Sequence, residues 1–189
     1  MKKSFGSKPL VFPTPTWVIG CYDAQGKANV MTAAWGGIVS SLPPSIGVSL
    51  RENRHSYQSI LAKGGFTISV PGAKHAREAD YFGLVSGRDR DKFAASGLTP
   101  QRAEFVDAPY VAEFPMIIEC RLSQTVELGQ HIQLIGEIVD VKVDEDALDA
   151  DGNPDMALLA PLVFAPGART YHTVGPAIGK AFSLGKGLL

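Results

Sequence analysis

The chain has 189 residues, of which 45% are hydrophobic and 20% charged, and its formal net charge at pH 7 is -1. This length and composition predict one globular domain spanning residues 1–189, with a substantial core. The near-zero charge and the lack of any polybasic block argue against a nucleic-acid partner.

The first half of the chain alternates strand-like and helix-like segments. Strands are expected at residues 16–22, 28–41, 45–50 and 66–71, with a turn at 23–26 joining the first two. Helical spacing covers residues 55–65, where Gly64 is the expected end, and two shorter helices, each stopped by glycine, are expected at 76–87 and 90–97.

The second half predicts two longer strands and an acidic loop. Residues 116–129 and 132–143 alternate apolar and polar side chains and meet at Gly129, Gln130 and His131. Residues 144–155 resemble a calcium loop but lack its final glutamate, so we expect a solvated loop. The whole pattern favours a mainly antiparallel β-domain with helical insertions.

The run from Ala28 to Leu50 contains no charged residue and is long enough to cross a membrane as a helix. Pro43, Pro44 and several serines and glycines would leave a lipid-exposed helix broken. We therefore expect no membrane association. Cys21 and Cys120 form no CxxC pair, and the N-terminus lacks a secretory signal, which favours buried thiols in a cytoplasmic protein.

Common nucleotide, phosphate and hydrolase motifs are absent, and the four histidines lie far apart, so no metal site is expected. Arg51, Arg54, His55 and Ser56 directly precede a predicted helix and would suit a phosphate. The competing interpretation is that Ser56 or Asn53 caps the helix while the arginines are solvated.

Two further residues allow both a structural and a functional interpretation. Trp35 lies among small residues that leave room for a planar ring, although tryptophan is more often a core residue. Lys92 either faces water or approaches a site.

In consistent order over about residues 10–175, the chain resembles the flavin reductase-like, FMN-binding split-barrel family, most closely its flavoredoxin-type members. The resemblance is carried by "NVMTAAWGGIVSSLPPSIGVSL", "RHSY", "GGFTISVP", "SGRDRDKFAASGLTP", "DAPYVAEFPMIIECRL" and "LGQHIQLIGEIVDV". It implies a six-stranded antiparallel Greek-key split β-barrel with short helical insertions. It also implies a homodimer that binds FMN near the dimer interface.

The resemblance also implies a set of cofactor-binding residues. The flavin ring would contact Thr32, Ala33, Ala34 and Trp35, with Ser40 and Ser41 continuing that wall. The ribityl chain would follow Ser49, Leu50 and Arg51 toward a phosphate held by His55 and Ser56, and Lys92 would approach the pyrimidine end of the ring.

His131 is the expected catalytic residue, on the nicotinamide side of the flavin. Many family members have Gly-Asp-His where this chain has Gly129, Gln130 and His131, which weakens the expectation that NADH or NADPH is the donor. The expected function is an FMN redox protein that either oxidises NAD(P)H or exchanges electrons with a redox partner protein. The alternative is a non-redox split-barrel module that binds another planar ligand, such as haem or pyridoxal phosphate.

Overall fold

The computed structural model describes residues 1–188. One sheet has seven strands, β2 (Trp17–Tyr22), β3 (Ala28–Ala33), β4 (Gly36–Ser41), β5 (Pro44–Leu50), β6 (Gly65–Val70), β9 (Met116–Leu128) and β10 (His131–Val143). Two small sheets contain β1 (Thr14–Pro15) with β11 (Val163–Ala165) and β12 (Thr170–His172), and β7 (Pro100–Arg102) with β8 (Pro109–Val111). The helices are α1 (His55–Lys63), α2 (Ala76–Leu84), α3 (Lys92–Ser96) and α4 (Met156–Leu159), with 3₁₀ turns at Ala73–His75, Glu145–Ala147 and Leu184–Leu188.

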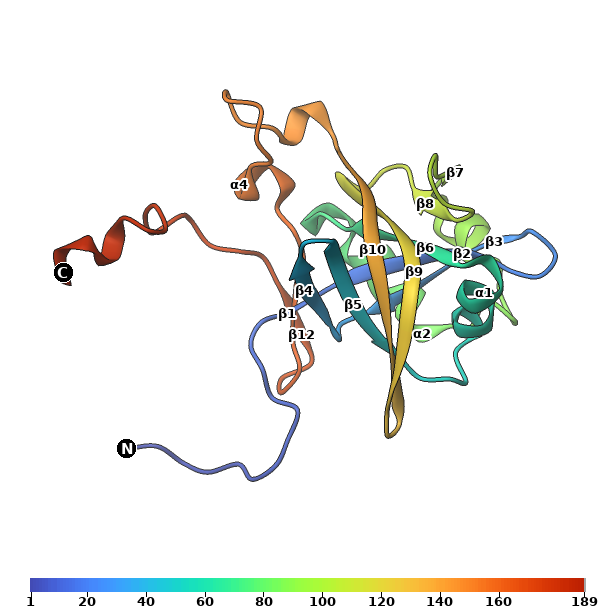
Figure 1. Ribbon diagram of the computed structural model, residues 1–189, viewed down its shortest axis with the longest axis horizontal. Helices are drawn as coiled ribbons and strands as arrows, with labels where there is room; N and C mark the ends of the chain where they lie inside the picture. Colours follow the sequence, from blue (N-terminus) through green and yellow to red (C-terminus); the bar gives the residue numbers. More distant parts are fainter. Residues whose placement is uncertain (189) are drawn as a thin grey trace.

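The large sheet is antiparallel and curves into a split barrel whose two outermost strands, β3 and β4, do not pair with each other (Figure 1). Its strand order is β3-β2-β6-β9-β10-β5-β4, so β3 and β4 follow each other in the chain yet end the order on opposite sides. Ala34 and Trp35 connect them, and the Ser49 N–H donates to the Trp35 carbonyl oxygen at 2.8 Å. This bond extends the pairing of β4 with β5, and the connection, called the seam, links the two outermost strands of the sheet.

The predicted class, a mainly β antiparallel split barrel with short helices, is confirmed, but the large sheet has seven strands rather than six. The difference arises at residues 28–41, which were expected to be one strand. They form β3 and β4, which pair with different neighbours. Leu42 and Pro43 make the turn to β5, so the double proline separates two strands as its composition indicates.

Apolar side chains that point to opposite faces of the strands form two separate clusters. On β2, Ile19 faces a cluster inside the barrel with Ile46 and Phe66, and Val18 faces a second cluster with Phe82 and Phe114. All of these side chains are buried because both faces of β2 are covered. The second cluster fixes α2 and α3 against the barrel beside β3.

The helix ends follow the sequence in two cases of three. Gly64 ends α1 and Gly97 ends α3, each with a left-handed backbone (φ 65° and 73°). At the start of α3, the Asp91 carboxylate caps the helix by accepting from the Ala94 N–H at 3.0 Å. Helix α2 instead ends at Leu84, because Val85 is already extended, and residues 85–88 form a loop.

A buried carboxylate attaches a loop to the barrel on β9. Glu119 is fully buried and accepts from the Glu104 and Phe105 N–H groups at 3.1 and 2.7 Å. The Lys142 ammonium lies 2.7 Å from the same carboxylate and also contacts Asp140.

Residues 144–155 are mostly exposed turns, as expected. Cys21 and Cys120 are buried free thiols. Within residues 1–188, no helix is long and apolar enough to cross a membrane and no cluster of metal-ligating side chains is present. The C-terminal arm, defined as residues 173–188, runs away from the barrel and is exposed throughout (Figure 1).

Candidate functional site

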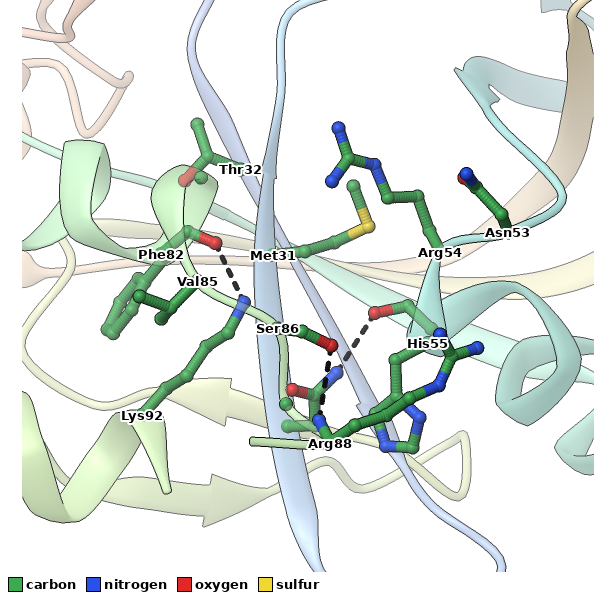
Figure 2. Close-up of a pocket in the computed structure, with 14 residues that line it drawn as sticks. Met31, Thr32, Asn53, Arg54, His55, Phe82, Val85, Ser86, Arg88 and Lys92 are labelled. Atoms are coloured by element: carbon green, nitrogen blue, oxygen red, sulfur yellow. Dashed lines mark hydrogen bonds between the residues drawn. The ribbon is translucent and has the colours of Figure 1, made fainter. Parts of the chain in front are cut away.

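A cavity of about 210 Å³, called the first cavity, lies between strand β3, the start of α1, the loop after α2 and the first residue of α3. Figure 2 shows Asn53, Arg54 and His55 on one side of it and Phe82 and Lys92 on the other. The lining residues are Asn29, Met31, Thr32, Asn53, Arg54, His55, Ser56, Phe82, Gly83, Val85, Ser86, Gly87, Arg88 and Lys92.

The N-terminus of α1 is not capped by a side chain. Arg54 occupies the cap position without a side-chain hydrogen bond, so neither Asn53 nor Ser56 acts as the cap considered from the sequence. The first N–H groups of a helix carry partial positive charge and need acceptors. Together with the Arg54 and Arg88 side chains lining the same cavity, they make this end suitable for an anion.

Asn29 forms the floor of this end. Its side chain is 5% exposed, and its Nδ2 donates to Ser56 Oγ at 2.9 Å. Its Oδ1 is buried without a partner, which is uncommon for a buried amide. A Cβ on Gly87 would lie 2.1 Å from this Oδ1, so only glycine lets the loop after α2 approach so closely.

Lys92 forms the opposite wall and is 4% exposed. Its ammonium donates to the carbonyl oxygens of Val30 at 2.8 Å and Phe82 at 2.7 Å. Burial lowers the pKa of Lys92 to about 8, with Cys21 opposing this shift and Arg54 adding to it. The cavity thus holds a cation with an ammonium proton that can be lost near physiological pH.

A second cavity of about 500 Å³ adjoins the first through Thr32 and Gly83, which line both. Its walls are mainly apolar and aromatic, formed by Pro9, Leu10, Thr16, Thr32, Ala34, Trp35, Asp80, Gly83, Leu84, Phe164, Pro166, Arg169 and Tyr171. The Thr32 hydroxyl donates to the Ala79 carbonyl and so fixes β3 to α2 between the two cavities.

Two polar features face the second cavity. The Thr16 hydroxyl is buried without a partner, and the Tyr171 hydroxyl donates to the Asp80 carboxylate at 2.9 Å. Burial and the adjacent Asp80 raise the pKa of Tyr171 to about 12, so it remains a neutral donor.

The structure brings together about half of the site residues expected from the sequence. Thr32, His55, Ser56 and Lys92 line the first cavity, and Ala34 and Trp35 join Thr32 in the second. Arg51 lines a separate open groove with Gly129 and Gln130.

The other expected residues lie around these cavities without lining them. Ala33 and Leu50 are buried in the barrel core, and Ser49 binds the seam at Trp35. Ser40 and Ser41 lie at the outer end of β4, and His131 is half-buried at the start of β10.

The flavin reductase like domain family matches residues 9–174. The chain belongs to this family. The family assignment makes it a flavin-dependent redox protein and confirms the resemblance seen in the sequence.

Solved flavoredoxins are similar to this flavin reductase-like protein over nearly its whole length. The flavoredoxin of Desulfovibrio vulgaris (Miyazaki F) is 53% identical with a TM-score of 0.95, covering 98% of this chain and 100% of that one. The flavoredoxin from Methanosarcina acetivorans is 29% identical with a TM-score of 0.92 and full coverage of both chains. The high molecular weight rubredoxin of Moorella thermoacetica is 37% identical over 111 residues, 56% of this chain and 45% of that protein.

Several residues that line the two cavities of this flavin reductase-like protein were not predicted from the sequence to be site residues. Asn29 carried a detectable signal, because asparagine is disfavoured in strands and here it stands in an otherwise apolar one. Ser86 belongs to a loop that was expected to be the end of a helix, and Arg88 lies just beyond that expected helix. Phe164 and Tyr171 come from the far end of the chain, and only the small sheet brings them to Trp35.

Proposed function

We propose that the protein binds FMN across the two cavities, with the phosphate at the start of α1 and the ring against residues 32–35. The observation that supports this proposal most strongly is that two cavities of different character adjoin at Thr32 and Gly83. The first is cationic and lies at the uncapped start of α1, and the second is apolar and aromatic. An FMN molecule has the same two ends, an anionic phosphate and a flat ring. Its ribityl hydroxyls can donate to the buried unpartnered Asn29 Oδ1, which as an amide oxygen only accepts, and Thr16 Oγ1 provides a further polar group.

In this proposal the polar residues of the first cavity and Trp35 of the second have defined tasks. Ser56, oriented by Asn29, and the α1 N–H groups donate hydrogen bonds to the phosphate, while Arg54 and Arg88 balance its charge. Lys92 holds the pyrimidine end of the ring, and Trp35 lies against its apolar part. Bound FMN supplies the redox chemistry, and the protein orients it and limits its exposure to water.

We further propose that the flavin exchanges electrons with a redox partner protein. The similarity to flavoredoxins over nearly the whole chain supports this use. NAD(P)H oxidation is the second candidate, supported by His131, which directly follows the Gly129–Gln130 turn that lines the open groove with Arg51. Gln130 supplies no carboxylate beside this histidine, which favours the carrier.

The test begins with the absorption spectrum of the purified protein and continues with anaerobic titration. FMN bands are expected, with slow or no bleaching by NADH or NADPH and full bleaching by dithionite. Rapid bleaching by either nicotinamide would establish the reductase instead. A haem or pyridoxal phosphate spectrum would contradict the FMN assignment.

The family resemblance also supports a homodimer with the flavin near the interface. A cytoplasmic location is proposed from the two buried free thiols, which suit a reducing compartment.

A further inference from the structure

We propose that the C-terminal arm of each protomer lies across the β4–β5 hairpin of a second copy of this chain, so that the dimer is held by exchanged arms. The inference rests on the homodimer proposed above. It adds which segments make the contact and brings a partner segment next to the flavin site.

In the described part of the chain, no hydrogen bond joins the arm to its own barrel. Its backbone hydrogen bonds join Lys180 to Ser183 and Leu184, and Ser183 to Lys186, all within the arm. Ile178 is 94% exposed and Phe182 is 99% exposed, and Val174, Leu184 and Leu188 are also open to water. Leaving such side chains exposed forfeits the free energy of apolar burial, so an arm of this composition indicates a missing partner surface.

The β4–β5 hairpin presents a matching surface. Strand β4 ends the sheet order, and edge strands with apolar side chains invite association unless they are covered or carry charge. On this edge Ile38 is 68% exposed and Leu42 is 88% exposed, with Val39 beside them, and no charged residue occurs between Ala28 and Leu50. The hairpin therefore lacks the usual protection of an edge and suits an apolar segment.

Symmetry favours a second copy as the occupant. In a twofold dimer each contact occurs twice, so one arm and one hairpin per chain satisfy both exposed surfaces at once. The arm and β4 lie on the same side of the molecule in Figure 1. The match to the solved Desulfovibrio flavoredoxin covers 98% of this chain and so extends into the arm, which indicates that its extended course is a shared structural feature.

The contact would place the partner's arm beside the flavin. Trp35 directly precedes β4 and lines the second cavity. An arm that extends along β4 to Gly36 would therefore border the cavity proposed for the flavin ring.

The test is sedimentation velocity of the FMN-loaded protein over a dilution series, for the full chain and for a chain lacking residues 174–189. We expect the full chain to be a dimer and the truncated chain to be a monomer at the same concentration. A monomeric full chain would overturn the dimer itself. A truncated chain that remains dimeric would overturn the arm contact while leaving the proposed dimer intact.

Matched leucine substitutions locate the contact. Leu184→Ser in the arm and Leu42→Ser in the hairpin should each raise the dimer dissociation constant at least about tenfold, because each buried leucine counts twice in the dimer. Leu158→Ser on α4 is the control, since Leu158 is also exposed but belongs to neither surface. Equal effects of all three substitutions would contradict the assigned contact.

Cross-linking tests the exchange directly. Leu42→Cys and Leu184→Cys proteins, purified separately and mixed, should be joined by a short bismaleimide, while the buried Cys21 and Cys120 remain unreactive. Failure to cross-link in a mixture shown to be dimeric would place the arm elsewhere and overturn the proposal.

Discussion

Lys92 and Glu119 are the buried charged side chains in the described part of the chain, and they have different surroundings. Glu119 is matched by an ammonium and two N–H groups, whereas Lys92 has carbonyl oxygens as partners and no carboxylate. A buried cation without a counter-ion is costly and is typical of a functional site.

Lys92→Met tests this charge through the flavin. Reduction adds negative charge at the pyrimidine end of the ring, which an ammonium stabilises. We expect the two-electron potential to fall by at least about 30 mV, equivalent to about 1.4 kcal/mol. Redox titration checks this, with Lys63→Met as the control because Lys63 forms only a surface ion pair with Asp107. An unchanged potential with the flavin still bound would remove Lys92 from this role.

The pKa of Lys92 predicts a pH dependence of FMN binding. With the pKa lowered to about 8 by burial, the flavin-free protein carries the ammonium at pH 7 and has largely lost it at pH 9. If binding requires the charged form, affinity falls about tenfold between these values. Quenching of FMN fluorescence measures it. The Lys92→Met protein should show no such slope, and a flat wild-type profile would contradict the prediction.

At the same scale, the sequence identified residues that lie close together in the chain and missed those assembled by the fold. His55 and Ser56 were found because helix starts bind anions, and Thr32 and Trp35 because a family pattern marks them. Asn29 meets Ser56 only through packing of β3 on α1, and Tyr171 meets Asp80 across a separation of 91 residues. Such pairings depend on topology, which local pattern does not encode.

Among the elements, the segment at 28–41 shows why a strand prediction can be right and the topology incomplete. No charge or proline marks the break at Ala34 and Trp35, and the one turn signal beside it, Gly36 and Gly37, lies inside the segment expected to be a strand. The break is required because β3 pairs with β2 while β4 pairs with β5. The end of β3 is therefore set by how the strands pair across the whole sheet.

Glu119 on strand β9 is expected to contribute strongly to the free energy of unfolding. Glu119→Ala removes the acceptor of two N–H groups and one partner of Lys142, and we expect a loss of about 3–5 kcal/mol in the free energy of unfolding. Urea denaturation checks it. The control is Glu137→Ala on β10, whose exposed pair with Arg121 should contribute less than about 1 kcal/mol. Equal losses would show that the buried cluster adds nothing.

The same cluster around Glu119 predicts that the protein loses stability at low pH. Burial alone would raise the pKa of Glu119, but hydrogen bonds from Lys142 and from the Phe105 and Glu104 N–H groups outweigh it and lower the pKa below its ordinary value of 4.5. A lowered pKa stabilises the fold above that value, and the stabilisation is lost as pH falls below it. The stability difference between wild type and Glu119→Gln should therefore shrink under acid conditions, and a constant difference would argue against a charged Glu119.

For the whole molecule, FMN should stabilise the fold by mass action. At free FMN one hundred times its dissociation constant, the free energy of unfolding rises by about 2.7 kcal/mol. For a chain of this size, that corresponds to a melting temperature higher by roughly 5–10 °C. Thermal denaturation with FMN and with riboflavin at equal concentration separates the contributions, because riboflavin lacks the phosphate. Equal increases in melting temperature with FMN and with riboflavin would show that the start of α1 does not bind the phosphate.

The seam at Trp35 links cofactor retention to the rigidity of the barrel. The carbonyl of this residue accepts the Ser49 N–H and so extends the pairing of β4 with β5 into the β3–β4 connection, while the same residue lines the cavity proposed for the ring. A ligand held against Trp35 restrains the peptide group that attaches the β3–β4 connection to β5. Local opening at the seam then becomes rarer when the site is filled, and slow hydrogen exchange of the Ser49 amide reports occupancy without any redox measurement.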